Sequence, residues 1–224
     1  MGSQKSTAEP PNSEPPISAV AASGPASALE PKRLRGRLRV AAILDAGAQV
    51  FAERGYDAAT MSEIAARSNT AIGSLYRFFP TKAVLGDALL ARYAEAMGAA
   101  FDVIAARTAE LSPNALADAL VELMLEAPVN RQGAQALLDS RSDGAGVRAT
   151  IRADARRRIG AILSAATGMG VERAEPVAIV LLQALKALPM LRDEVEALRP
   201  ALLTETRALI RLYVARAFDL GRAT

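Results

Sequence analysis

The sequence contains no cysteine, no histidine and no tryptophan, and aromatic residues make up only 4% of its 224 positions. Without cysteine the chain can form no disulfide and no thiolate metal site, and without histidine it has no imidazole ligand. The same absences exclude Ser-His and Cys-His catalytic arrangements. Neither a paired-carboxylate motif nor a glycine-rich phosphate loop is visible. We therefore expect no enzymatic activity, no metal and no cofactor.

The sequence also lacks a long apolar run. The longest, from Val177 to Leu191, is interrupted by a glutamine, a lysine and a proline, and it falls short of the roughly 20 residues that a membrane-spanning helix needs. Residues 1–31 are rich in proline, serine and alanine and contain no apolar signal-peptide segment. This composition predicts a disordered tail on a cytoplasmic protein.

The most specific local pattern is a short capped helix, a turn and a second short helix. Thr60 and Glu63 have the spacing of a capping box. Residues 68–70, Ser-Asn-Thr, have turn chemistry, and asparagine tolerates the left-handed conformation that ends a helix. Pro80 forces its predecessor out of helical geometry, so the second helix, which begins near Ala71, must stop there. The pattern predicts a helix-turn-helix whose second helix enters the DNA major groove.

Apolar residues repeat at helical spacing in this unit and in the helix before it. Gly55 is expected to end that earlier helix. In the second short helix we expect an inner face of Leu75, Phe78 and Phe79 and an outer face of Ile72, Gly73, Tyr76 and Arg77. The three helices are predicted to share a small core centred on Phe51, Ile64, Leu75 and Phe79.

A run of basic residues at 32–39 precedes these helices. Because the whole chain has a net charge of only +3, positive charge is concentrated in this run. A mobile basic arm suits phosphate contact or insertion into the minor groove, and a solubilising charge run is the alternative. A membrane-surface patch or a calmodulin-like target is disfavoured, because Leu34 and Leu38 make only a small apolar face. The arm residues are Lys32, Arg33, Arg35, Arg37 and Arg39.

Lys82 lies in the first turn of the next helix, which Thr81 is expected to cap. A cation there meets the positive end of the helix dipole. A bound DNA phosphate would instead accept the helix amides and the lysine charge together. We interpret Lys82 as a phosphate contact, with a solvated surface lysine as the alternative.

Residues 38–84 resemble the DNA-binding domain of the tetracycline-repressor (TetR) family. The resemblance lies in the run AGAQVFAERGYDAATMSEIAARS and in GSLYRFFPTK, whose family pattern is roughly small–Leu–Tyr–x–His/Tyr–Phe–x–x–Lys. It implies an all-helical homodimeric repressor that leaves its DNA operator when it binds a small molecule. The DNA contacts that it implies are the phosphate contacts Tyr76 and Lys82, the backbone contact Thr60, the groove-facing helix start Ala71, Ile72, Gly73 and Ser74, and the variable position Arg77.

Three positions depart from the family pattern. Ala71 replaces a frequent serine cap, so the second helix is expected to lose one side-chain contact. Phe78 stands where histidine is common. Ile72 cannot hydrogen-bond a base edge but can contact a thymine methyl, so base-specific hydrogen bonds are expected from Ser74, Arg77 or the arm.

The second half has helical periodicity and no segment that predicts a strand. The fold is therefore predicted to be all-α, with an N-terminal three-helix helix-turn-helix DNA-binding domain and a C-terminal helical ligand-binding and dimerisation domain. We expect a tail at 1–31, an arm at 32–39, the helix-turn-helix domain at 40–82 and the effector-binding and dimerisation domain at 83–220.

Dimerisation is expected because one short helix reads too few base pairs, whereas two heads on a two-fold axis read an inverted repeat. The last two helices are predicted to form the interface through Ala178, Leu181, Leu182, Leu185, Leu202, Leu209, Leu212 and Tyr213.

An effector pocket is expected among the middle helices. Its candidate lining residues, for which ordinary core packing is the alternative, are Met97, Phe101, Met124, Leu125 and Gln183. Gln183, polar within an apolar run, is expected to orient a ligand or to pair with its symmetry mate. The aliphatic composition favours an aliphatic or amphipathic small molecule. A second basic cluster, Arg152 and Arg156–Arg158, is interpreted as a solvated face that pairs with Asp154, in preference to a second nucleic-acid site.

These features predict a transcriptional regulator, most simply a repressor, with a double-stranded DNA operator, a second copy of the chain and a small-molecule effector as partners. Three alternatives remain: a ligand-dependent activator, a helical DNA-binding or interaction protein without a ligand, and a helical enzyme or lipid-binding module with an incidental turn motif.

Overall fold

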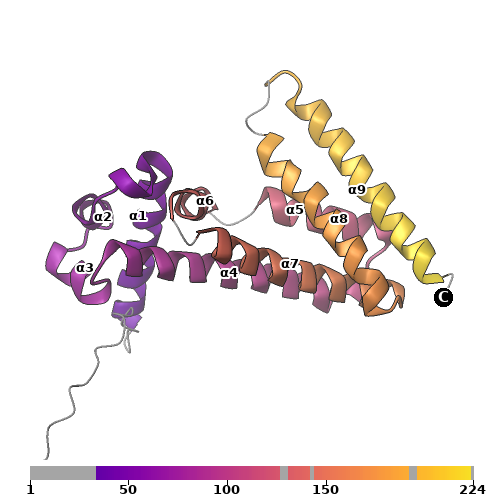
Figure 1. Cartoon of the computed structure of the whole chain (residues 1–224), viewed down its shortest axis with the longest axis horizontal. Coiled ribbons are helices and arrows are strands. Elements are labelled where there is room, and N and C mark those ends of the chain that lie inside the picture. The colour runs from indigo at the N-terminus through magenta and orange to yellow at the C-terminus, as the bar shows by residue number, and fades with distance from the viewer. Residues whose placement is uncertain (1–33, 127–130, 142–143, 192–195, 223–224) are drawn as a thin grey trace, which may run out of the picture.

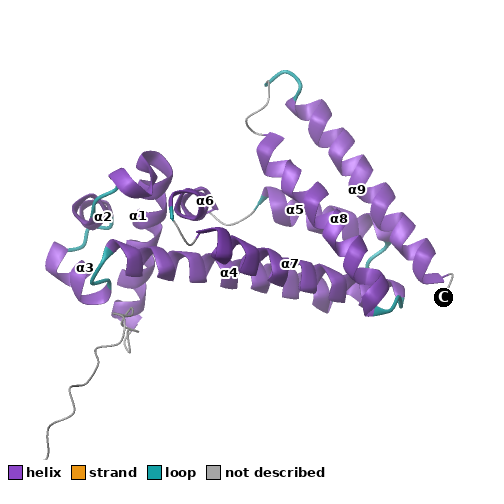
Figure 2. Cartoon of the chain, in the orientation of Figure 1, coloured by secondary structure: helices purple, strands orange, loops and turns teal. Residues whose placement is uncertain are grey.

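The structure, a computed structural model, describes residues 34–126, 131–141, 144–191 and 196–222. Within these ranges all regular structure is helical (Figures 1 and 2), which confirms the all-α prediction. The elements are α1 (Leu34–Ala58), α2 (Met61–Arg67), α3 (Ile72–Phe78), α4 (Lys82–Ala106), a 3₁₀ turn η1 (Thr108–Glu110), α5 (Pro113–Leu125), α6 (Arg131–Ser140), α7 (Gly144–Thr167), α8 (Val171–Met190) and α9 (Arg199–Arg222). None of the helices in the described part of the chain is long and apolar enough to cross a membrane.

The basic arm is partly helical, contrary to the predicted mobile segment. α1 begins at Leu34, so Arg35, Arg37 and Arg39 lie in its first turns. Lys32 and Arg33, like the predicted tail at 1–31, lie outside the described residues. The helix extends toward the N-terminus because residues 34–39 contain arginine and leucine, both good helix formers, and no proline.

The head is formed by α1, α2 and α3 around one apolar core. Phe51, Ile64, Leu75 and Phe79 are each at most 1% exposed, which confirms the predicted centre of this core. Gly55 adopts φ 76° and ψ 165°, so it breaks the regular helix where the sequence predicted a stop. The last residues of α1 lie beyond this kink and lead into α2.

α6 packs on the head although it lies far from α1 in the sequence. Ala134, Leu137 and Leu138 belong to the same core as α1 and α3. Gly133 allows a close approach, because a Cβ atom there would lie 2.4 Å from the carbonyl oxygen of Ala48. Figure 1 shows α6 beside α1. The sequence prediction placed this helix with the effector domain because chain order was its only guide.

A second core is formed by α5, α7, α8 and α9 with the second half of α4. α4 contributes Leu85 and Leu89 to the head core and Phe101 and Ile104 to the second core. Figure 1 shows α4 running from the head to the second core with α7 beside it. One 25-residue helix therefore connects the two cores without interruption.

An ion pair and a hydrogen bond from Arg158 of α7 connect α7 to α4. The Arg158 guanidinium donates to the Gly98 carbonyl at 3.2 Å and to Asp102 at 2.5 Å, and it pairs with Asp154 at 2.7 Å. Arg157 also pairs with Asp154. The expected pairing with Asp154 is thus confirmed for Arg157 and Arg158.

Part of the predicted dimer interface is wrong. Four of its residues on α8 are at most 6% exposed and lie in the chain's own second core: Ala178, Leu181, Leu182 and Leu185. Burial of apolar surface is non-directional, so an apolar stripe does not reveal whether it faces its own core or a second copy. These four side chains cannot reach a partner.

The predicted interface residues on α9 remain accessible in part. Leu209 and Leu212 are 58% and 71% exposed, and Val180 on α8 is 50% exposed. Leu202 and Tyr213 are half-buried. An apolar surface therefore persists on α8 and α9, although its residues differ from those predicted on α8.

Candidate nucleic-acid interface

The start of α2 is fixed by a reciprocal cap. The Glu63 amide donates to Thr60 Oγ1 at 3.1 Å, and the Thr60 amide donates to Glu63 Oε2 at 3.0 Å. The Thr60 hydroxyl also donates to this carboxylate, and these bonds lower the pKa of Glu63. The predicted capping box is confirmed. The Thr60 amide and hydroxyl therefore already make hydrogen bonds within the chain.

The turn between α2 and α3 has the predicted left-handed residue. Asn69 adopts φ 48°, which lets the chain reverse direction within three residues. The Thr70 amide donates to the Ala65 carbonyl at 2.9 Å, and the Thr70 hydroxyl donates to the Ser68 carbonyl. These bonds satisfy the end of α2 and hold α3 at a fixed angle to it.

α3 presents the predicted outer face. Ile72 and Tyr76 are 42% and 47% exposed, and Gly73 and Arg77 are exposed beside them. The Arg77 guanidinium lies 5.2 Å from the centroid of the Phe78 ring, which is within cation–π range. The outer face of α3 therefore offers one aliphatic, one phenolic and one cationic side chain to a partner.

The structure shows the environment of two residues that depart from the family pattern, Ala71 and Phe78, and of Ser74. Ala71 is the N-cap residue and makes no side-chain hydrogen bond, as expected for an alanine. Phe78 is 7% exposed and packs in the head core. Ser74 is half-buried, and its hydroxyl oxygen is covered without a hydrogen-bond partner. Base contact by Ser74 would require this hydroxyl to rotate outward.

Lys82 has partners that the sequence did not indicate. α3 ends before Pro80, and Thr81 caps α4 by accepting from the Val84 amide. The Lys82 ammonium then donates to three carbonyls at the end of α1, those of Tyr56 at 2.6 Å, Asp57 at 2.9 Å and Ala59 at 3.0 Å.

It also lies 4.6 Å from the Tyr56 ring centroid. An ammonium has three hydrogens, so Lys82 uses all of them to connect α4 to the α1–α2 junction. Lys82 therefore holds the start of α4 against the α1–α2 junction. A phosphate bound nearby would be attracted by the ammonium charge or would replace one of the three carbonyls as its acceptor. No signal in the sequence reveals this role, because the carbonyls lie 23 to 26 positions away.

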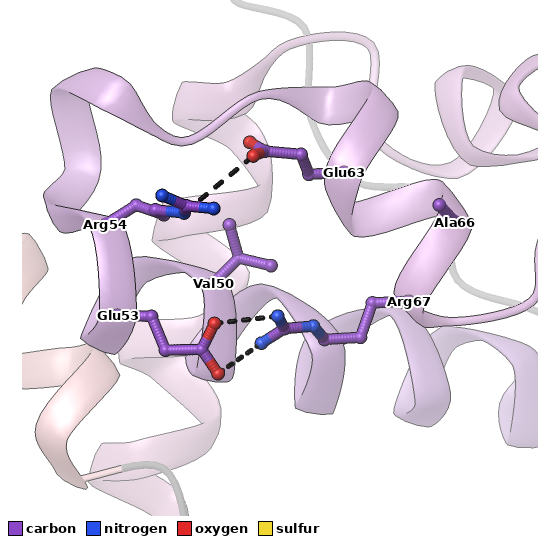
Figure 3. A pocket seen from close by; sticks show the side chains of 6 residues that line it. All are labelled: Val50, Glu53, Arg54, Glu63, Ala66 and Arg67. Carbon is purple, nitrogen blue, oxygen red and sulfur yellow. Dashed lines mark hydrogen bonds and ion pairs between the residues drawn. The ribbon is translucent and has the colours of Figure 1, made fainter.

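A surface hollow of about 280 Å³ lies between α1 and α2. Its rim is closed by a two-bond ion pair between Arg67 and Glu53, at 2.6 and 2.7 Å, and by a longer pair between Arg54 and Glu63 at 4.0 Å (Figure 3). The Arg67 hydrogen bonds lower the pKa of Glu53. The charges at the rim neutralise one another. These ion pairs therefore hold α2 in a fixed orientation on α1.

The cations at the start of α1 are accessible. Arg35, Arg37 and Arg39 are exposed and make no ion pair with any residue in the part of the chain that the structure describes. Leu34 and Leu38, on the same turns, are 73% and 63% exposed. The first turns of α1 therefore carry unneutralised positive charge next to the head.

The predicted effector residues lie in two environments. Phe101 and Met124 are 2% and 5% exposed in the second core, and Met97 and Leu125 pack against it. Gln183 is exposed on α8, where its side-chain oxygen accepts from Lys186 at 3.3 Å. Gln183 therefore does not line the second core, and its two expected roles, orienting a ligand or pairing with its symmetry mate, remain predictions.

The head also matches known proteins. The sequence model of bacterial regulatory proteins of the tetR family matches residues 43–89. Residues 43–89 therefore carry the DNA-binding domain of this family. Of curated relatives, the HTH-type transcriptional repressor KstR from Mycolicibacterium smegmatis is 40% identical over 60 residues, which are 27% of this chain and 29% of KstR. The chain thus matches less than a third of the length of this relative.

Solved TetR-type structures share the fold over most of the chain. A transcriptional regulator of Aquifex aeolicus superposes with a TM-score of 0.60 at 21% identity, covering 78% of this chain and 98% of the other. A TetR-like regulator of Rhodococcus sp. RHA1 superposes with a TM-score of 0.58 at 23% identity, covering 84% and 99%. The likeness in fold therefore extends well beyond the residues that the family model matches.

Proposed function

We propose that this chain is a TetR-family transcriptional repressor that binds an inverted-repeat operator as a homodimer and releases it on binding a small molecule. The observation that supports DNA binding best is the outer face of α3. It exposes Ile72, Tyr76 and Arg77 on a helix whose position is fixed by the Asn69 turn and by Lys82. A rigid, accessible helix with mixed chemistry suits insertion into the major groove.

The contacts are proposed to divide by chemistry. Tyr76 and the α1 arginines Arg35, Arg37 and Arg39 would bind phosphates, together with Lys32 and Arg33. Ile72 would contact a thymine methyl, and Arg77 would reach a base edge. Thr60 and Lys82 would act mainly by holding α2 and α3, because their polar groups already have partners within the chain.

Dimerisation is proposed to use the exposed surface of α8 and α9, with Val180, Leu209 and Leu212 in its centre. Two heads about one DNA turn apart, roughly 34–36 Å, would read two half-sites. A repressor role is supported by the name of the relative KstR, a transcriptional repressor whose similarity covers 27% of this chain.

Release is proposed to act through α4, because this helix belongs to both cores and its first turn holds the head. A ligand that binds one arrangement of the second core better than another would tilt α4 and change the spacing of the two heads. Effector and operator must then weaken each other's binding by the same factor.

A mobility-shift titration on genomic fragments that the purified protein retains would test DNA binding. Removal of the Tyr76 hydroxyl by Tyr76→Phe is expected to weaken binding to all sequences by roughly 3- to 10-fold, the effect of one hydrogen bond, with base preference retained. Tyr93→Phe removes a hydroxyl from the half-buried ring of Tyr93 on α4, outside the predicted DNA contacts and the predicted interface, and is the matched control. Equal affinity for both variants would refute the proposed docking of α3.

A further inference from the structure

One side of α7 carries a row of cations with no acidic residue of the same helix on that side. Arg148, Arg152 and Arg156 are spaced by four residues, so they share one side of the helix. The only acidic residue of α7 is Asp154, and it pairs with Arg157 and Arg158. α7 therefore offers no acid to this row of three arginines.

Lys186 on α8 lies beside the same row. α7 and α8 pack in opposite directions, and a Cβ atom at Gly160 would lie 3.9 Å from the Cβ atom of Ala178. Eight residues before Gly160 is Arg152, and eight residues after Ala178 is Lys186. Burial lowers the pKa of Lys186, and the charges of Arg152 and Arg148 lower it further. The lysine and the arginines are thus close enough to repel one another.

These cations are largely unneutralised. Arg148 pairs with Asp139 at 2.9 Å. Among the described residues, Lys186 donates only to the neutral Gln183 side chain, at 3.3 Å. Arg152 and Arg156 make no ion pair or hydrogen bond with the described residues, and the Arg156 Nε atom is covered from solvent without a partner. Arg152 is exposed, whereas Arg156 and Lys186 are half-buried. A half-buried cation without a counter-ion destabilises a fold, so the presence of these two indicates a binding role.

We propose that Arg152, Arg156 and Lys186 bind the phosphate group of a small-molecule ligand on the surface where α7 and α8 meet. Arginine forks bind phosphate oxygens through paired hydrogen bonds, and lysine adds a point charge.

A small molecule fits this cluster better than DNA does. Arg156 and Lys186 are half-buried, whereas the arginines of α1 are exposed. The inference rests on the proposed function only in that the phosphate would belong to the effector. Binding of an anion at this cluster is a separate event from its effect on DNA.

The first test uses inorganic pyrophosphate as the probe, with isothermal titration at constant ionic strength. The wild-type chain is expected to bind it, and Lys186→Gln and Arg152→Gln are expected to weaken binding by roughly 10-fold or more each, as for loss of a charged hydrogen bond. Arg157→Gln is the control, because it makes the same charge change on the same helix at an exposed site paired with Asp154. Similar weakening in all three variants would overturn the proposal, as would no binding to wild type.

Thermal melting without ligand gives a second readout. Lys186→Gln is expected to raise the melting temperature, because it removes a half-buried cation from its like-charged neighbours. Arg158→Gln is expected to lower it, because Arg158 bonds to α4. A decrease in both variants would identify Lys186 as a structural cation and overturn the proposal.

Binding to a short non-specific DNA duplex distinguishes the sources of phosphate. Without pyrophosphate, Lys186→Gln and Arg152→Gln are expected to bind this DNA as the wild type does. A loss greater than that of Arg157→Gln would assign the cluster to DNA and overturn the small-molecule proposal. If pyrophosphate binds at the cluster but leaves operator affinity unchanged, the phosphate site stands and ligand-controlled release by this site fails.

Discussion

The contact between α6 and α1 makes a strong prediction about one glycine. At Gly133 a Cβ atom would lie 2.4 Å from the Ala48 carbonyl oxygen, 2.7 Å from its Cα and 2.8 Å from its carbonyl carbon. Non-bonded carbon atoms prefer separations of about 3.5–4.0 Å. All three obstacles are backbone atoms, so no side-chain rotation relieves the clash. Gly133→Ala must push α6 away from α1 by roughly 1 Å.

The expected size follows from two opposing effects. Overpacking of this kind destabilises by about 1–3 kcal/mol, while alanine in a helix stabilises by about 0.5–1 kcal/mol over glycine. The net loss is about 1–2 kcal/mol. For a chain of this size, each kcal/mol shifts the melting temperature by about 2–4 °C, so we expect a decrease of about 2–8 °C.

The chain provides a matched control for this substitution. Gly146 is the third residue of α7, as Gly133 is the third residue of α6, and nothing lies within 4 Å of a Cβ atom built there. Gly146→Ala is therefore expected to raise the melting temperature slightly. Circular dichroism or differential scanning fluorimetry measures the melting temperature of both variants. If Gly133→Ala melts as high as Gly146→Ala, α6 is not pressed against the α1 backbone and this account of the head is wrong.

Three further predictions concern the cap, an ion pair and the dimer. Thr60→Ala removes the capping box and is expected to destabilise the head by about 1 kcal/mol, visible as faster amide exchange in α2; unchanged exchange would contradict this. The Arg211 hydrogen bond lowers the pKa of Asp118 in the folded chain, so the carboxylate stabilises the fold above its unfolded pKa of about 3.9, and this stabilisation is lost as pH falls through the lower folded value. The gap in melting temperature between wild type and Asp118→Asn should therefore narrow below about pH 4, and a gap that stays constant to pH 3 would exclude this linkage. Leu212→Glu is expected to convert the proposed dimer to monomer in light scattering, whereas Val103→Glu, at a similarly exposed site on α4, should not; a monomeric wild type would refute the proposed interface.

The sequence predicted the features that depend on neighbouring residues. The Thr60–Glu63 cap, the left-handed Asn69 and the stop before Pro80 each involve atoms within four positions of one another. Helical spacing likewise identified the centre of the head core. Local hydrogen bonding and apolar periodicity depend only on residues a few positions apart, so they could be recognised without coordinates.

The predicted binding residues on the outer face of α3 remain a prediction, but their exposure agrees with it. Ile72, Tyr76 and Arg77 were expected outside, and they are exposed. The spacing of Leu75 and Phe78 fixes the inner face, so the opposite face must point outward. The sequence could not show that the Ser74 hydroxyl is covered, because that depends on side-chain rotation against its neighbours.

Tertiary structure decided everything that depends on which segments meet. Lys82 reaches carbonyls at the end of α1, and Gly133 brings α6 onto Ala48. The apolar stripe at Ala178 and Leu181 faces the chain's own core, although it was predicted to face a second copy. By itself the sequence determined the cap of α2, the turn after it and the stop of α3, and which sides of the helices are apolar. Only the folded chain decided what covers each side, because apolar burial has no preferred partner and a lysine charge does not specify its distant acceptor.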